Sequence, residues 1–111
     1  MNNEEMNEQQ NSDMQMYVIL RRSAWNSPAE LEAAGERSAR CADEEMPNDI
    51  RWIRSYVLDE VAGAVGTVCI YQASSAEKVL EHARRVGMAA DEVIPVADTV
   101  FVRPDPVSTT A

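Results

Sequence analysis

The fold is decided by the segment IRWIRSYVLD, residues 50–59, and by the segment VGTVCIYQ that follows it at residues 65–72. Both segments are rich in β-branched and aromatic residues, and in both the side chains alternate between two sets, as they do in β-strands. The short connection between them contains Gly63. We therefore predict that the two strands form an antiparallel hairpin.

A strand and a helix precede this hairpin. Residues 14–22 are apolar on both faces, which is typical of a central strand. Ser27 and Glu30 form a capping box, and Pro28 fits the first helical position, so we expect a helix to begin there. Small and apolar residues then recur every three or four positions as far as about Glu45, which predicts an amphipathic helix.

A second helix and a last strand follow the hairpin. Residues 74–77 repeat the capping box, and Gly87 occupies the position of a left-handed C-terminal cap. Residues 93–102 are predicted to form one broken strand or two short ones, because Pro95 cannot donate a hydrogen bond to a sheet. The order β-α-β-β-α-β predicts an α+β, ferredoxin-like fold, in which two helices lie on one face of a four-stranded antiparallel sheet.

One domain accounts for most of the chain. Its 111 residues are enough for one domain and too few for two. Residues 1–13 are polar and residues 104–111 contain two prolines, so we predict disordered tails on either side of a domain at residues 14–103. Cys41 and Cys69 lack the spacing of a disulfide scaffold, a redox motif or a zinc site, which indicates a reduced, cytoplasmic protein.

The charge and hydropathy of the chain argue against several classes of function. The formal net charge is −9, from 19 acidic and 10 basic residues, although the predicted domain holds 14 of the acids and carries only −4. Because an acidic protein repels phosphate groups, we expect no nucleic-acid partner. No apolar stretch approaches the roughly 18 residues of a membrane span, and the first 16 residues contain no basic residue, so we expect neither a span nor a signal peptide.

The hairpin carries two sets of side chains that we assign to opposite faces of the sheet. We expect the helices to cover the aliphatic set, Ile53, Val57, Val68 and Ile70. The open face then carries Trp52, Arg54, Tyr56, Leu58, Thr67, Cys69 and Tyr71. Such an aromatic patch is larger than a soluble monomer usually exposes, which predicts a homodimer with the two sheets packed face to face.

Two forms of such a dimer remain open. The sheets can meet in a filled interface, or they can enclose a small-molecule pocket. In the second form Trp52, Tyr56 and Tyr71 are apolar walls, and Arg54 orients the ligand. Arg54 can also stack on an aromatic ring or pair with an acid of the second subunit. RNA-binding domains of this topology set their aromatics among basic residues, and this acidic domain does not.

Few other residues offer chemistry. His82 is the only histidine, and no carboxylate or cysteine stands three or four residues away from it to share a metal. We expect a solvated helix residue, with metal ligation as the alternative. The acidic residues between 43 and 49 could hold a hard cation, but consecutive helix positions point in different directions, which favours a solvated helix end. Common nucleotide-binding, hydrolase and zinc-protease motifs are absent from the sequence.

Three segments of the chain carry a resemblance to a known family: residues 50–57, 67–77 and 81–93. They resemble small bacterial proteins that are classed as a domain of unknown function and are commonly labelled nickel-binding proteins. The resemblance extends over roughly residues 15–97. It implies a dimeric ferredoxin-like fold and, as a cofactor, nickel or another divalent metal. The metal-linked members are richer in histidine than this chain. Here a metal site would therefore depend on the single histidine, His82.

The sequence therefore predicts a homodimer that binds a small molecule or a metal ion. The alternative is a small enzyme without an organic cofactor, of the isomerase, cyclase or monooxygenase type. In that enzyme Arg54, Tyr56 and Tyr71 would polarise a substrate at the aromatic open face. A cavity beside Arg54 would favour the enzyme, whereas a filled and dry interface would exclude it.

Overall fold

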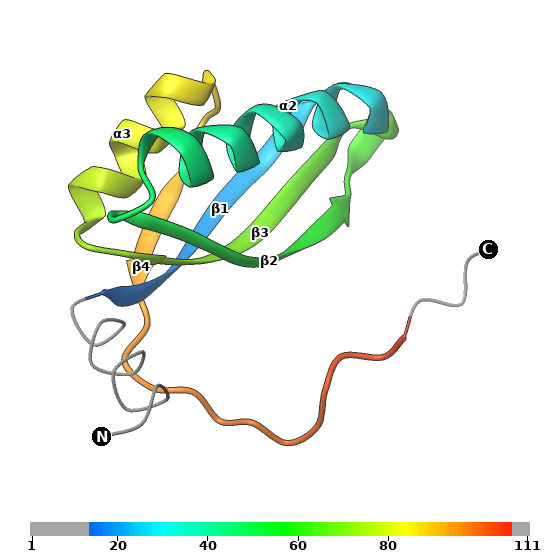
Figure 1. Cartoon of the computed structure of the whole chain (residues 1–111). Helices are drawn as coiled ribbons and strands as arrows, with labels where there is room; N and C mark the ends of the chain where they lie inside the picture. The colour runs from blue at the N-terminus through cyan, green and yellow to red at the C-terminus, as the bar shows by residue number, and fades with distance from the viewer. Residues whose placement is uncertain (1–13, 108–111) are drawn as a thin grey trace, which may run out of the picture.

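Four antiparallel strands form one sheet with two helices on one of its faces, as a computed structural model of residues 14–107 shows (Figure 1). The strands are β1 (Gln15–Trp25), β2 (Ile50–Asp59), β3 (Val65–Ala73) and β4 (Glu92–Pro95), and the helices are α2 (Pro28–Arg40) and α3 (Ala76–Val86). The strands lie in the order β2-β3-β1-β4, with every neighbouring pair antiparallel. The α+β, ferredoxin-like fold predicted from the sequence is confirmed.

The ends of the helices lie where the capping residues predict them. Ser27 and Ser75 each accept a hydrogen bond at the side-chain oxygen from the backbone N–H three residues further on. Gly87 ends α3 in the left-handed region with a φ of 81°. A short π-helical turn, Cys41–Glu45, continues α2 to its predicted end. No helix within residues 14–107 has the length and apolar composition of a membrane span.

The last strand is shorter than predicted. It ends at Pro95, and residues 96–107 then run as an extended segment along the face of the sheet opposite the helices (Figure 1). Within this segment Asp105, which we placed in a disordered tail, accepts hydrogen bonds from Arg54 and Tyr56. The remaining parts of the predicted tails, residues 1–13 and 108–111, lie outside the described residues.

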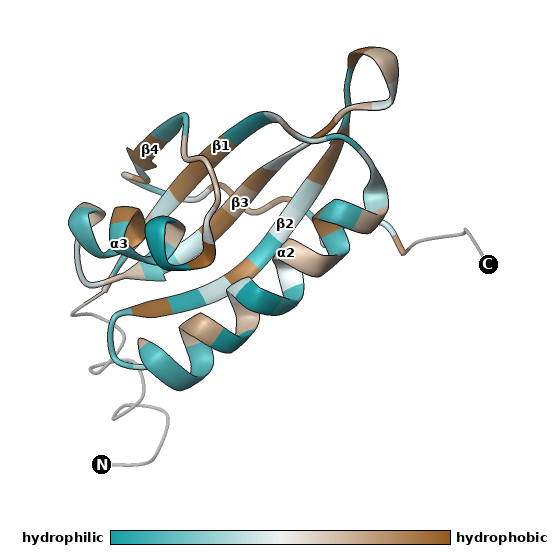
Figure 2. Cartoon of the chain, turned by 90° about the horizontal axis from the view of Figure 1, so that it is seen from above, coloured by the Kyte–Doolittle hydropathy of each residue, from teal (hydrophilic) through white to brown (hydrophobic). Residues whose placement is uncertain are grey.

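The two faces of β3 are the reverse of our prediction. Thr67, Cys69 and Tyr71 are buried under the helices, whereas Val68 and Ile70 are half-buried on the open face. Hydropathy points to the wrong face here: β3 is largely hydrophobic (Figure 2), but its aliphatic Val68 and Ile70 lie on the open face, and the less hydrophobic Thr67 and Tyr71 lie under the helices. A tyrosine can be buried in this way when its hydroxyl finds a hydrogen-bond partner.

A β-bulge in β2 changes which of its side chains lie on each face of the sheet. Trp52 pairs with Tyr71, but the next paired residue is Arg54, so the register shifts by one residue between them. Trp52 and Ser55 therefore lie on the helix side, and Arg54 and Tyr56 lie on the open face. We predicted that Trp52, Arg54, Tyr56 and Tyr71 share the open face, and this is wrong. Trp52 and Tyr71 lie on the helix side of the sheet, whereas Arg54 and Tyr56 lie on the open face.

A second irregularity lies at the end of β1. The register with β3 shifts between Arg21 and Trp25, and Ser23 within this stretch has a φ of 47°. The carboxylate of Glu60 holds the stretch in place by accepting a hydrogen bond from the Ser23 N–H. On β3, Gly66 provides the room: a Cβ there would lie 2.5 Å from the carbonyl oxygen of Arg21 and 3.0 Å from the Ser23 nitrogen.

We expect Gly66→Ala to lower the free energy of unfolding by about 1–3 kcal/mol, because its methyl group would meet backbone atoms of β1. Gly35→Ala on α2 is the control: a Cβ there has Trp52 Cη2 as its nearest neighbour, at 3.8 Å. Alanine in a helix should raise the free energy of unfolding by about 0.5–1 kcal/mol. Urea unfolding measures both variants, and a Gly66→Ala variant as stable as the native protein would contradict the close approach of the two strands.

Candidate functional site

A cavity of about 460 Å³ lies between α2 and the sheet, and we call it the α2 cavity. Its lining is mostly apolar and includes Trp25 of β1, Trp52 of β2 and Met88. Gly35 of α2 lies over the Trp52 ring and carries no side chain that would fill the space. The volume falls within the range of roughly 300–1,000 Å³ that is typical of small-molecule sites.

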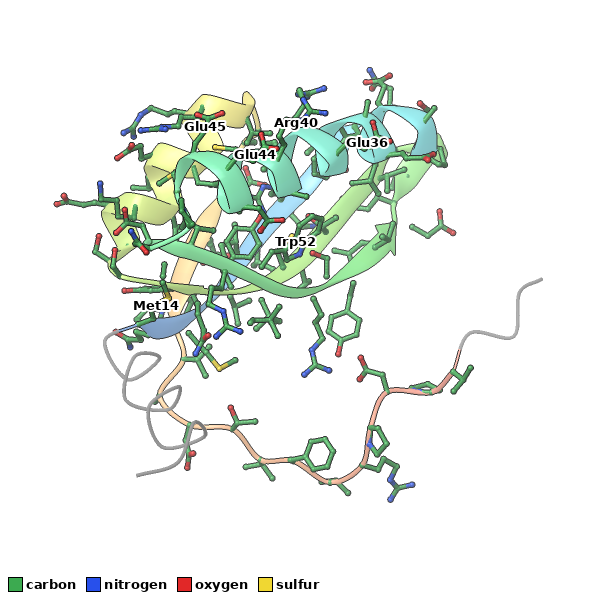
Figure 3. The ribbon with its side chains drawn as sticks, viewed as in Figure 1. Met14, Glu36, Arg40, Glu44, Glu45 and Trp52 are labelled. Atoms are coloured by element: carbon green, nitrogen blue, oxygen red, sulfur yellow. The ribbon has the colours of Figure 1, made fainter. Side chains whose placement is uncertain are left out.

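The mouth of the α2 cavity lies between α2 and the edge strand β2. Four lining residues are exposed there: Glu32 and Glu36 on the helix, and Trp52 and Val57 on the strand. Figure 3 shows the Trp52 side chain on the helix side of β2, beneath the part of α2 that carries Glu36. A ligand can therefore enter from solvent past two solvated carboxylates and an indole ring.

A row of hydrogen-bonded side chains forms the floor of the α2 cavity. The Trp52 indole Nε1 donates to Ser55 Oγ at 2.8 Å, Ser55 Oγ donates to Cys69 Sγ at 3.0 Å, and Cys69 Sγ donates to Thr67 Oγ1 at 3.4 Å. The row ends at Thr67, whose oxygen accepts a hydrogen bond.

The buried charged group of the α2 cavity is Arg21, which is 0% exposed. Within the described part of the chain, none of its three guanidinium nitrogens has a hydrogen-bond partner. Its nearest polar neighbour is Tyr71: the Arg21 Cζ atom lies 5.8 Å from the centroid of the Tyr71 ring, and the charge of Arg21 also acts on the Tyr71 hydroxyl, but neither contact supplies an opposite charge. A buried ion without an opposite charge costs several kcal/mol, so Arg21 is the most unusual group in the cavity.

Tyr71 and His82 join both helices to the sheet through Ser38. The Tyr71 hydroxyl lies 3.2 Å from Ser38 Oγ, and His82 Nε2 lies 3.1 Å from the Ser38 carbonyl oxygen, to which it donates. The His82 ring meets the Tyr71 ring edge-on, with 5.4 Å between centroids. His82 is 0% exposed, so our prediction of a solvated helix histidine is wrong. Burial raises the pKa of Tyr71, which keeps its hydroxyl neutral.

The other two predicted ligand-binding residues lie outside the cavity. Arg54 and Tyr56 are exposed on the open face, where Arg54 Nη1 and the Tyr56 hydroxyl lie 3.2 Å and 2.9 Å from Asp105 Oδ2. The hydrogen bonds from Tyr56 and Arg54 lower the pKa of Asp105. Of the four residues that we predicted to bind a ligand, only Trp52 and Tyr71 line the α2 cavity.

Comparison with known proteins places the chain in a family. The family described as nickel responsive protein, SCO4226-like, matches residues 17–96. The chain belongs to the SCO4226-like family. This confirms the resemblance found in the sequence. The crystal structure of SCO4226 from Streptomyces coelicolor A3(2) is similar with a TM-score of 0.60 and 19% identity, over 77% of this chain and 99% of that one. At this identity the likeness shows a shared fold. No curated protein matches the chain.

Nickel, which the description of the SCO4226-like family suggests, does not fit the described residues. His82 is enclosed in the core, where Nε2 is bonded to a carbonyl and Nδ1 has no partner. Within residues 14–107 no group of three or more histidines, cysteines and acids could hold a metal ion. The acids that follow α2 have other partners, since Glu45 pairs with Arg85 and Asp49 accepts a hydrogen bond from Ser74.

The buried imidazole predicts a pH dependence of stability. Burial lowers the pKa of His82 below its ordinary value of 6.5, and the charge of Arg21 lowers it further, against the opposing hydrogen bond to the Ser38 carbonyl. The unfolded chain therefore takes up this proton at a higher pH than the folded one. The contribution of neutral His82 to the free energy of unfolding is complete above about pH 6.5. It decreases as the pH falls from there towards the pKa of His82 in the folded protein.

We expect His82→Gln to flatten this dependence, because glutamine keeps an N–H donor and does not titrate. Urea unfolding at about pH 7 and about pH 5 should give a larger loss of unfolding free energy for the native protein than for the variant. An equal loss of unfolding free energy in both proteins would show that carboxylates, and not His82, cause the pH dependence of stability.

Proposed function

We propose that the protein is a homodimer that binds a small molecule in the α2 cavity. The observation that carries the proposal is a cavity of ligand size, lined by two tryptophans and a tyrosine, that also holds a buried and unpaired arginine. Apolar walls with a few polar groups are typical of small-molecule sites.

Binding is favoured over catalysis by the positions of the polar side chains. The enzyme that we considered from sequence needs Arg54, Tyr56 and Tyr71 around one substrate. Tyr71 lies under the helices and the other two lie across the sheet, in contact with Asp105. That arrangement supplies no common substrate site for the three residues.

The proposed dimer is supported by apolar groups on the open face. Five half-buried or exposed aliphatic side chains lie there: Val18, Leu20, Val68, Ile70 and Ile94. The extended segment after β4 adds Val100, Phe101 and Val102, all more than two-thirds exposed. Apolar surface of this extent favours a partner. A second copy of the chain fits best, since a two-fold axis pairs such a face with itself and lets each segment pack on the other subunit.

The ligand site can be tested with the neutral fluorescent probe N-phenyl-1-naphthylamine. We expect the probe to bind the native protein, and Gly35→Leu to weaken binding at least about tenfold, because the leucine would occupy the space above Trp52. Ala33→Leu on the exposed side of α2 is the matched control and should bind as the native protein does. Failure of the native protein to bind the probe, or equal binding by both leucine variants, would contradict the proposed site.

The dimer can be tested by light scattering. We expect the native protein to have the mass of two chains and Ile70→Glu to have the mass of one, because two carboxylates would be buried in the interface. Val61→Glu is the control, since Val61 is exposed in the connection between β2 and β3. A monomeric native protein, or a dimeric Ile70→Glu variant, would show that the open face is not the contact.

A further inference from the structure

The guanidinium group of Arg21 in the α2 cavity has more N–H donors than there are hydrogen-bond acceptors near it in the described part of the chain. Buried polar groups in folded proteins are almost always hydrogen-bonded, yet all three guanidinium nitrogens of Arg21 are unpaired within residues 14–107. The guanidinium presents its N–H groups as a planar fork, which matches two oxygens of a carboxylate. An anion in the cavity would satisfy these donors and the buried positive charge together, once the guanidinium nitrogens, which have no exposed surface in this structure, turn towards it.

Neighbouring hydroxyl groups add donors beside this fork. Thr67 lies directly opposite Arg21 in the register of β1 with β3, and its hydroxyl, which contacts the weakly bonding thiol of Cys69, can turn to donate to a ligand. Tyr71, which Arg21 approaches, shares one hydrogen bond with Ser38, so one proton of that pair also remains available. Each of these groups can donate to an anionic oxygen.

The charges around the cavity limit the ligand to one negative charge. Arg21 is the basic residue of the lining, and it can neutralise one such charge. The acids of the lining, Glu32 and Glu36, stand exposed at the mouth and would repel a second. A carboxylate meets this condition, whereas a phosphate monoester carries between one and two charges near neutral pH.

The rest of the lining determines the body of the ligand. Trp25 and Trp52 offer aromatic surface, and Leu31 and Met88 offer aliphatic surface. We propose that the α2 cavity binds a carboxylic acid with an apolar, ring-containing body, and that Arg21 holds its carboxylate with help from Thr67. This inference rests on the proposed function, which makes the α2 cavity the ligand site, and it adds the chemical class of the ligand.

The test compares two probes that differ only in charge, 2-naphthoate and 2-naphthamide, as competitors of N-phenyl-1-naphthylamine. With the native protein, naphthoate should displace the dye at a concentration about ten- to a hundredfold lower than naphthamide, as expected for hydrogen bonds to a charged group. Arg21→Met should bind the dye and lose the preference for naphthoate. Arg54→Met, which removes a basic residue on the opposite face, should keep it.

Arg21→Lys provides a second variant. It keeps the charge without the fork, so it should retain part of the preference for naphthoate. Equal displacement by the two probes in the native protein would overturn the inference and leave the cavity as a site for neutral ligands. A preference that survives in Arg21→Met would also overturn it, and loss of the preference in Arg54→Met would move the anion site to the open face. Failure of the native protein to bind the dye would overturn the proposed function itself.

Discussion

Pairing of β1 with β3 in the middle of the sheet sets the positions of Arg21, Thr67 and Tyr71 in the α2 cavity. In this register Tyr17, Ile19 and Arg21 stand opposite Tyr71, Cys69 and Thr67. Side chains alternate between the faces of a strand, so these six residues form two adjacent rows beneath the helices. The buried charge, its hydroxyl neighbour and the aromatic ring beside it therefore come from one stretch of backbone hydrogen bonds rather than from loops.

The helices are held over these rows by polar contacts in an otherwise apolar core. Ser38 accepts a hydrogen bond at its carbonyl oxygen from His82 and shares another at its hydroxyl with Tyr71. Satisfied polar groups of this kind specify one arrangement of packed elements, because any other arrangement would leave them buried without partners. These hydrogen bonds of Ser38 fix the distance between α2 and the sheet. The depth of the α2 cavity therefore depends on them.

Local signals in the sequence predicted the elements and their order. Ser27, Ser75 and Gly87 act at the backbone of their own helix ends, so their effect can be inferred without knowledge of distant residues. The assignment of faces failed because it depends on the whole fold. The more aliphatic face of β3 points away from the helices, and the bulge between Trp52 and Arg54 leaves no mark in an alternating sequence.

Two buried polar residues could have been found by following the spacing of the apolar residues further. Arg21 continues the row of Tyr17 and Ile19, and that spacing places it on the buried face of β1. His82 lies three residues after Val79 and four before Val86, within the apolar stripe of α3. In both cases the signal was a polar residue at a position where the spacing of its neighbours predicts burial. That Arg21 has no hydrogen-bond partner among residues 14–107 depends on distant elements and is visible only in the structure.

The bulge in β2 also bears on how this chain can change in length. An extra residue in β3 would exchange its two faces, moving Thr67 and Tyr71 out from under the helices and Val68 and Ile70 beneath them, so cavity and open face would be lost together. β2 already accommodates one unpaired residue and, within the described residues, borders no strand on its outer side. An additional residue is therefore tolerated more readily in β2 than in β3.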